Sequence, residues 1–188
     1  MQAMLPDRIF LLLITLLCIT TVFAFSGHPV DSDKWTDEYD RHFRKYSKRY
    51  FGPLFDWHWF KAQAIAESNL NADAVSHVGA RGLMQIMPDT FKEITDKNPH
   101  FAEVDQPRWN IAAGIYYDRL LYRKFPTTPV QDRLYLALAS YNAGFGRILI
   151  ASRKLLTDSP LWQEVKPYMP RETRDDGDRI KILLGVAG

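Results

Sequence analysis

The helical spacing of apolar and aromatic side chains is the feature that most constrains how this chain can fold. The clearest run of this kind consists of Val130, Leu134, Ala137, Leu138 and Tyr141. These side chains fall on one face of a helix, since residues three or four positions apart lie above one another. The run ends at Gly144, where glycine can adopt the left-handed conformation that commonly closes a helix. The spacing therefore predicts a mainly α protein whose helices each bury one face.

Similar patterns predict further helices on both sides of this run. An aromatic stripe predicts an N-terminal amphipathic helix over residues 33–52, with Asp33 as its candidate N-cap; it comprises Trp35, Tyr39, His42, Phe43, Tyr46 and Tyr50. We favour core packing for this stripe, and an interfacial membrane helix is the alternative because lysines and an arginine lie beside the aromatics. More helices are expected over residues 56–68, from Pro88 onward, and over 110–125 and 146–156, with a minor β-hairpin near 80–86.

An apolar leader precedes this pattern. Residues 9–25 carry no charge, and Ala24 offers a small side chain at the end of a signal-peptidase triplet. Residues 1–24 are therefore expected to be a signal peptide that directs the chain to the periplasm or cell envelope. The alternatives are an uncleaved membrane anchor formed by residues 9–25 and a buried core helix. The only cysteine is Cys18 within the leader, so a chain cut after Ala24 has neither disulfides nor thiolate ligands.

Composition narrows the class of protein further. The chain has 188 residues, of which 46% are hydrophobic, and these values suit one globular domain. A formal net charge of +2 is too small to indicate nucleic-acid binding, for which a clustered basic surface is expected. The five histidines include no pair four residues apart with a glutamate between them. No metal site and no cofactor are therefore predicted.

Glu67 is the first candidate for chemistry. It follows an apolar, alanine-rich stretch that begins at Trp57. A carboxyl group held against apolar walls keeps its proton toward neutral pH, and it can then donate that proton to a leaving group. The alternative is a helix whose last turn reaches water, because most helical glutamates are solvated.

Three further motifs decide between these alternatives. Glu67-Ser68 is followed by the stretches Gly79–Thr90, Asn110–Gly114 and Ala137–Gly144. In order and spacing they resemble the catalytic domain of the soluble lytic transglycosylases, a lysozyme-like fold that acts on peptidoglycan. The resemblance covers roughly residues 39–148, and we expect the catalytic domain over residues 53–170. Residues 171–188 receive no structural assignment, because an acidic run follows Glu172-Thr173-Arg174 where the family commonly has Tyr-Val.

The resemblance implies a chemistry that needs one carboxyl group. Glu67 would protonate the glycosidic oxygen between N-acetylmuramic acid and N-acetylglucosamine, and then accept the proton of the muramic acid C6 hydroxyl as a 1,6-anhydro ring closes. Ordinary glycosidases need two carboxylates. The nearest other acids, Asp73 and Asp89, are explained equally well by turns and caps.

Five other residues are expected to bind substrate. The set comprises Ser68, Met84, Gln85, Tyr141 and Asn142. Met84 offers an apolar wall for a sugar face, and Gln85 an amide for the sugar acetamido group. Tyr141 matches the family tyrosine whose hydroxyl approaches the catalytic carboxyl group.

Peptidoglycan strands are the expected partner, with envelope or secretion machinery as a further one. Two alternatives remain open. One is a lysozyme-type hydrolase on the same fold, in which water replaces the C6 hydroxyl. The other is a non-catalytic scaffold that binds peptidoglycan.

Overall fold

The structure is a computed structural model, and it describes residues 28–186. The predicted signal peptide or anchor, residues 1–24 or 9–25, lies outside the described residues. Between residues 28 and 186 no helix has both the length and the apolar character that crossing a bilayer requires.

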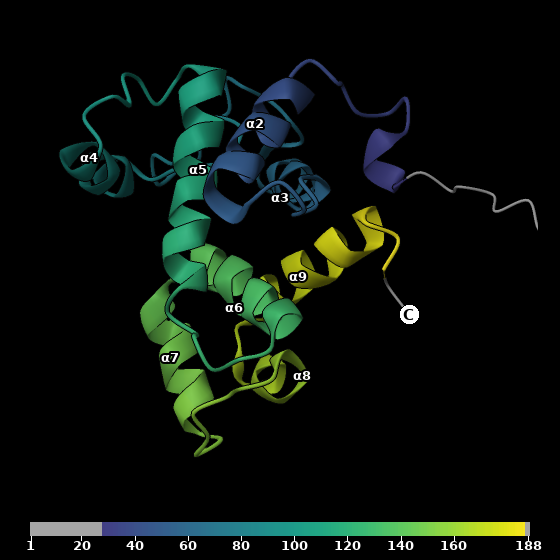
Figure 1. Ribbon diagram of the computed structural model, residues 1–188, viewed down its shortest axis with the longest axis vertical. Coiled ribbons are helices and arrows are strands. Elements are labelled where there is room, and N and C mark those ends of the chain that lie inside the picture. Colours follow the sequence, from purple (N-terminus) through teal and green to yellow (C-terminus); the bar gives the residue numbers. More distant parts are fainter. Residues whose placement is uncertain (1–27, 187–188) are drawn as a thin grey trace, which may run out of the picture.

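The described chain is built from helices joined by short loops (Figure 1). In order they are η1 (Pro29–Asp31), α2 (Asp40–Phe51), α3 (His58–Ser68), α4 (Pro88–Lys97), α5 (Pro107–Tyr122), α6 (Val130–Ala143), α7 (Phe145–Arg153), α8 (Trp162–Val165), η2 (Lys166–Tyr168) and α9 (Arg171–Leu183). Extended pairing within residues 28–186 is limited to two antiparallel bridges, in which Arg81 pairs with both Val75 and Ile86. The mainly α prediction is confirmed, and the predicted hairpin is reduced to these bridges.

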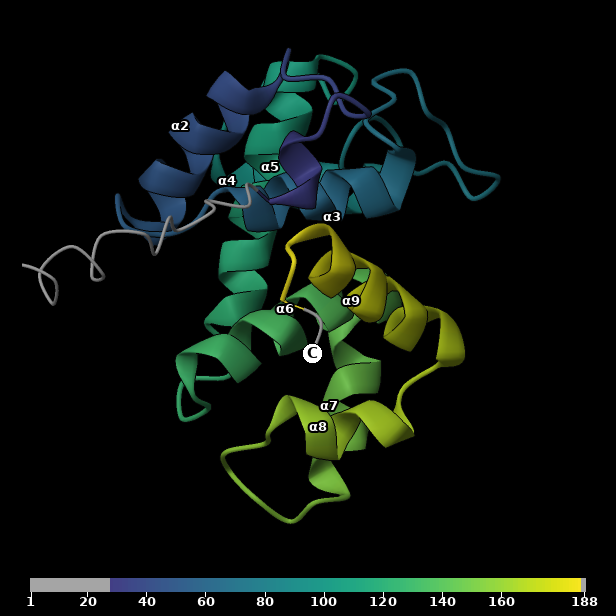
Figure 2. The same cartoon turned by 90° about the vertical axis from the view of Figure 1, so that its right-hand side faces the viewer.

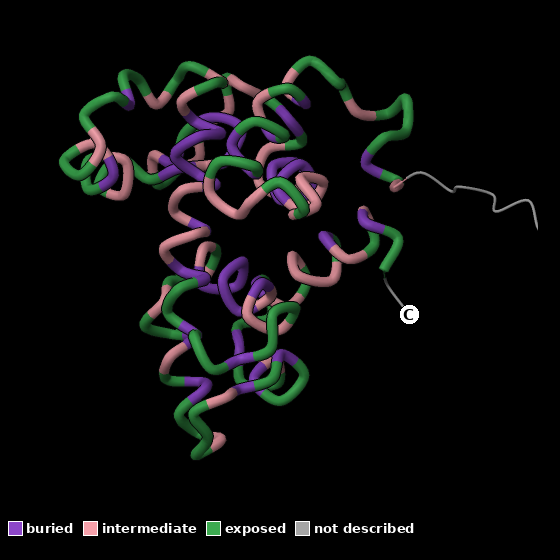
Figure 3. The backbone as a smooth tube through the Cα atoms, in the orientation of Figure 1, coloured by how far each residue is buried: buried purple, intermediate pink, exposed green. Residues whose placement is uncertain are grey.

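Helix α5 connects the two halves of the molecule. It packs against α2 at one end and against α6 at the other, and Figure 1 shows it running from the α2–α4 half toward α6 and α7. Its buried residues Ile111, Ala112 and Ile115 join the larger core, which also contains most of the buried face of α3. A smaller core around Trp162 fills the space among α6, α7 and α8. Figure 3 shows that many of the buried residues lie along α3, α5 and α6.

The N-terminal helix starts later than predicted. It begins at Asp40 with Tyr39 as N-cap, so the expected start near residue 33 and the role of Asp33 as N-cap are wrong. Asp40 lies in the first turn, where a negative charge is favoured by the helix dipole. Its carboxylate also pairs at 2.9 Å with the Lys61 ammonium group, which is only 1% exposed. This buried pair favours a helix start at Asp40.

The C-terminal segment, for which no structure was predicted, forms α9. This helix begins after Pro170, and Thr173 and Ile180 are buried on its inner face. It packs against α3 and α6, and Figure 2 shows it lying across α6 below α3. Gly146–Leu156, expected as the last helix, corresponds to α7 and is followed by both α8 and α9.

Candidate functional site

Helix α3 holds Glu67 one residue before its end. Ala62, Ala64 and Ile65 are fully buried, so the helix is fixed by apolar packing. It ends at Asn69, which adopts the left-handed conformation at φ 54°. The hydroxyl of Ser68 donates to the Ala64 carbonyl at 3.1 Å and to the Leu83 carbonyl at 2.9 Å. Ser68 therefore ties the last turn of α3 to the loop of residues 79–87.

The surroundings of Glu67 favour its neutral form. Burial, and then the charges of Asp176 and Glu172, raise the pKa of Glu67 from its ordinary value of 4.5 to about 8. No hydrogen bond to the Glu67 carboxyl group is found among the described residues, so nothing of that kind compensates the charged form. At neutral pH the carboxyl group consequently keeps a proton that it could donate.

A narrow cavity of about 20 Å³ adjoins Glu67, which is room for about one water molecule. Its walls come from α3, α6, α8 and α9. They comprise Gln63, Ala66, Glu67, Tyr135, Leu138, Ala139, Asn142, Trp162, Thr173, Asp176, Gly177 and Ile180. Glu67 therefore lies where α3 meets α6 and α9.

Asn110 of α5 makes three hydrogen bonds that hold the loop of residues 79–87 and the neighbouring Val104 against the core. Its Oδ1 accepts a hydrogen bond from the Met84 N–H at 2.7 Å, and its Nδ2 donates to the Arg81 and Val104 carbonyls, both at 2.9 Å. Gly82, at φ +72°, has no room for a side chain, because a Cβ there would lie 2.4 Å from Asn110 Nδ2. Two hydrogen bonds from Asn110, to Met84 and Arg81, thus join the second and third sequence motifs.

Two predicted binding residues on this loop have defined surroundings. Gln85, at φ 45°, donates from Nε2 to the Ala74 carbonyl at 3.1 Å and to the Gly82 carbonyl at 2.9 Å. Its carboxamide oxygen has no partner within residues 28–186. Met84 is fully buried, and a Cβ added to Gly114 would meet its side chain at 2.8 Å. The expected contact between Met84 and a sugar face is therefore not available, since the side chain fills the core beneath the loop.

The two predicted residues on α6 also make internal contacts. The Tyr141 hydroxyl donates to the Met84 carbonyl at 2.7 Å, and burial, with the nearby Asp118 and Glu67, holds the pKa of Tyr141 well above its usual value. Its hydroxyl proton is thus directed to the loop and not to the Glu67 carboxyl group. Asn142 faces α9, donating to Asp176 Oδ2 at 2.7 Å and accepting from Thr173 Oγ1 at 2.8 Å.

The structure adds two acids that the sequence reasoning missed. Asp118 of α5 is fully buried, and its Oδ1 accepts a hydrogen bond from Gln63 Nε2 at 3.3 Å. Burial, with a smaller contribution from the charge of Glu67, holds the pKa of Asp118 well above its ordinary value. The sequence contained one signal for Asp118, because this acid lies between Ile115 and Leu121 on the apolar face of its helix. Asp176 gave no such signal, because its segment had no predicted structure.

Comparisons with known proteins agree with this geometry. The family described as Transglycosylase SLT domain matches residues 45–155. The membrane-bound lytic murein transglycosylase F of Histophilus somni (strain 2336) is 37% identical over 127 residues, which cover 65% of this chain and 25% of that protein. The same enzyme of Actinobacillus pleuropneumoniae serotype 3 is 34% identical over 129 residues, again covering 65% and 25%.

Solved structures give the same result. An inactive mutant of the lytic transglycosylase Slt from Pseudomonas aeruginosa aligns with a TM-score of 0.67 and 26% identity, covering 80% of this chain and 24% of that one. The 70 kDa soluble lytic transglycosylase of Escherichia coli aligns with a TM-score of 0.62 and 26% identity, covering 79% and 24%. The chain thus spans about a quarter of the length of these relatives. The lysozyme-like fold implied by the sequence motifs is confirmed.

Proposed function

The chain belongs to the transglycosylase SLT domain family, and we propose that it cleaves the β-1,4 bond between N-acetylmuramic acid and N-acetylglucosamine in peptidoglycan. The muramic acid product would carry a 1,6-anhydro ring at its end. The observation that carries the proposal is the state of Glu67, whose raised pKa keeps a proton available at neutral pH.

The proposed reaction uses Glu67 twice. Its carboxyl group first donates a proton to the glycosidic oxygen, the bond from that oxygen to the muramic acid C1 breaks, and N-acetylglucosamine leaves with a free hydroxyl group. The C6 hydroxyl of the muramic acid then attacks C1 and gives its proton to the Glu67 carboxylate. The acid is restored, and no water is consumed. One group serves both steps because a pKa of about 8 suits donation and acceptance near neutral pH.

Gln85 is the residue that we propose for direct contact with the sugar. Its Nε2 is held by two backbone carbonyls, so the carboxamide is oriented and its oxygen is left to accept a hydrogen bond from an acetamido N–H. Ser68, Tyr141 and Asn142 support the site through the loop and α9 contacts described above. We propose that these three residues hold the loop and α9 in place around Glu67. Whether the leader is cleaved would decide whether the protein acts free in the periplasm or held at the membrane.

Product analysis tests the proposal. Purified sacculi would be digested with the full chain, with Glu67→Gln and with the matched control Glu103→Gln, whose carboxylate is exposed. Mass spectrometry should show anhydro-muropeptides with the wild type and the control, and none with Glu67→Gln. Products with a reducing muramic acid, heavier by one water, would identify a hydrolase instead. Binding of sacculi without release of any muropeptide would identify a scaffold.

A further inference from the structure

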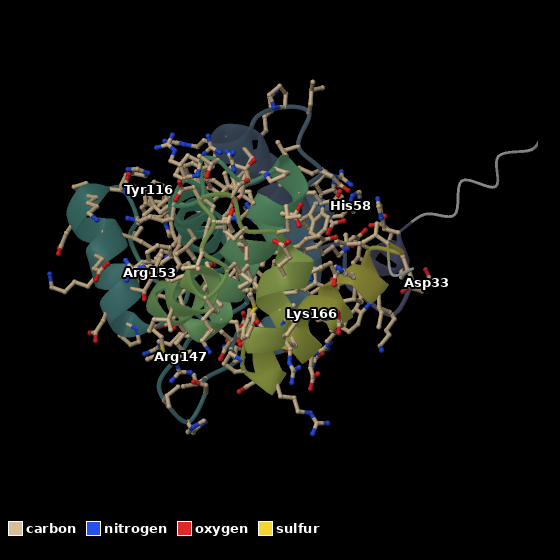
Figure 4. The ribbon with its side chains drawn as sticks, turned by 90° about the horizontal axis from the view of Figure 1, so that it is seen from below. Asp33, His58, Tyr116, Arg147, Arg153 and Lys166 are labelled. Carbon is tan, nitrogen blue, oxygen red and sulfur yellow. The ribbon has the colours of Figure 1, made fainter. Side chains whose placement is uncertain are left out.

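A cluster of two histidines and two carboxylates lies away from Glu67. His28 precedes η1, Asp31 ends η1, Asp56 lies two residues before α3, and His58 is the first residue of α3. Ligand atoms of His28, Asp56 and His58 all lie within 4.8 Å of one another. Figure 4 shows His58 on the side of the molecule where the N-terminal end of the described chain and the C-terminal end of α9 come together.

Acceptors outside the cluster's centre lie beside one ring nitrogen of each histidine. The Nδ1 of His28 lies 3.0 Å from the Leu184 carbonyl, which can only accept, so this nitrogen carries a hydrogen and Nε2 is the metal-binding nitrogen. The Nε2 of His58 lies 3.2 Å from Asp31 Oδ2, so a metal ion at Nδ1 would leave the ring hydrogen on Nε2 facing this carboxylate.

Both of these nitrogens lie near the same carboxylate. His28 Nε2 lies 3.5 Å from Asp56 Oδ2, and His58 Nδ1 lies 2.5 Å from Asp56 Oδ1. Asp56 Oδ1 also accepts the backbone N–H of His58 at 3.0 Å. Two imidazole nitrogens and a carboxylate, all of them groups that bind zinc, are thus brought together by the fold.

We propose that His28, Asp56 and His58 bind a zinc ion. Two imidazole nitrogens and one carboxylate form a donor set that zinc accepts, and the fourth position is left for water. Asp31 and the Leu184 carbonyl supply the outer contacts that hold metal-bound histidines in one orientation. Ligands about 2.0 Å from a tetrahedral ion lie about 3.3 Å apart, so the His28–Asp56 pair already has this spacing. The His58–Asp56 pair must open by rotation of the carboxylate.

The bound ion would join three separate parts of the fold. Its ligands come from the segment before η1 and from the start of α3, while Leu184, at the end of α9, orients His28. Because α9 carries Asp176 beside Glu67, the ion would hold both walls of the catalytic site together. These ligands are not at metal-binding spacing along the chain, and only the fold brings His28 beside Asp56 and His58.

Calorimetry with Zn²⁺ alone tests this proposal without any activity measurement. The full chain, stripped of metal with a chelator, should bind one equivalent near neutral pH and melt at a higher temperature when loaded. His28→Ala and Asp56→Asn should remove this binding, and Asp31→Asn should weaken it by about 10-fold to 100-fold. His77→Ala, which changes an exposed histidine elsewhere, should bind like the wild type.

Two results would overturn the zinc site. One is folded wild-type chain that binds no Zn²⁺. The other is binding that survives unchanged in all three cluster variants, since that ion would lie elsewhere. Neither result would contradict the proposed peptidoglycan cleavage, which is tested separately by mass spectrometry of the digestion products.

Discussion

Replacing Glu67 by glutamine should stabilise the fold while removing the proposed proton donor. The pKa of Glu67 is raised from 4.5 to about 8, so the folded chain holds this proton more tightly than the unfolded chain does. The stability that this proton brings is complete below about pH 4.5 and is lost as the pH rises through about 8. Glutamine stays neutral at every pH, so the variant does not lose stability in this way as the pH rises.

The size of the effect follows from the pKa shift. At 1.36 kcal/mol for each unit, a shift from 4.5 to about 8 corresponds to about 5 kcal/mol above pH 8 and to about 3 kcal/mol at pH 7. These are upper values, because Glu67 keeps some contact with solvent, which screens its charge. Near pH 4 the two proteins should be almost equally stable.

Urea denaturation at a series of pH values measures this difference. The free energies of unfolding of the wild type and Glu67→Gln should separate steadily between about pH 5 and pH 8, with similar dependence on urea. Glu103→Gln, at an exposed position, should follow the wild type. A Glu67→Gln difference that does not change with pH, or a variant less stable than the wild type at pH 7, would refute the assignment of a buried, neutral Glu67.

Three further variants test the surroundings of the site. Asp176→Asn removes one of the charges that raise the pKa of Glu67, so the alkaline limit of muropeptide release should move to lower pH, whereas exposed Asp175→Asn should leave it in place. Gly114→Ala places a Cβ 2.8 Å from a buried methionine and should cost about 1–3 kcal/mol of unfolding free energy in urea. Asn110→Ala removes the three hydrogen bonds of a buried side chain and should cost about 3 kcal/mol or more in the same assay, and a loss below about 1 kcal/mol would contradict its role in holding the loop.

The sequence predicted those parts of the fold whose apolar residues repeat with a helical period. The run from Val130 to Tyr141 became α6 almost as expected, because Leu134, Ala137 and Leu138 are buried, although Val130 at the start of the helix is 68% exposed. In α9 the signal was too weak, since Thr173 and Ile180 are the only residues of that helix that are buried. The rest of the helix is strongly polar, and tertiary packing decides its structure. Its acids therefore could not be assigned to the site in advance.

The motifs located Glu67, and the structure shows what raises the pKa of this lone carboxyl group. In glycosidases with two carboxylates, the second group takes part in the reaction as a nucleophile or a base. Here the largest cause is burial at the junction of α3, α6 and α9, and the acids of α9 add to it. Asp176 Oδ2 accepts a hydrogen bond from Asn142 of α6 at 2.7 Å, which fixes the position of its carboxylate. From that position the charge of Asp176 raises the pKa of Glu67. The pKa can thus be raised without a second reacting carboxylate, which leaves stabilisation of the anomeric carbon to the substrate in the proposed reaction.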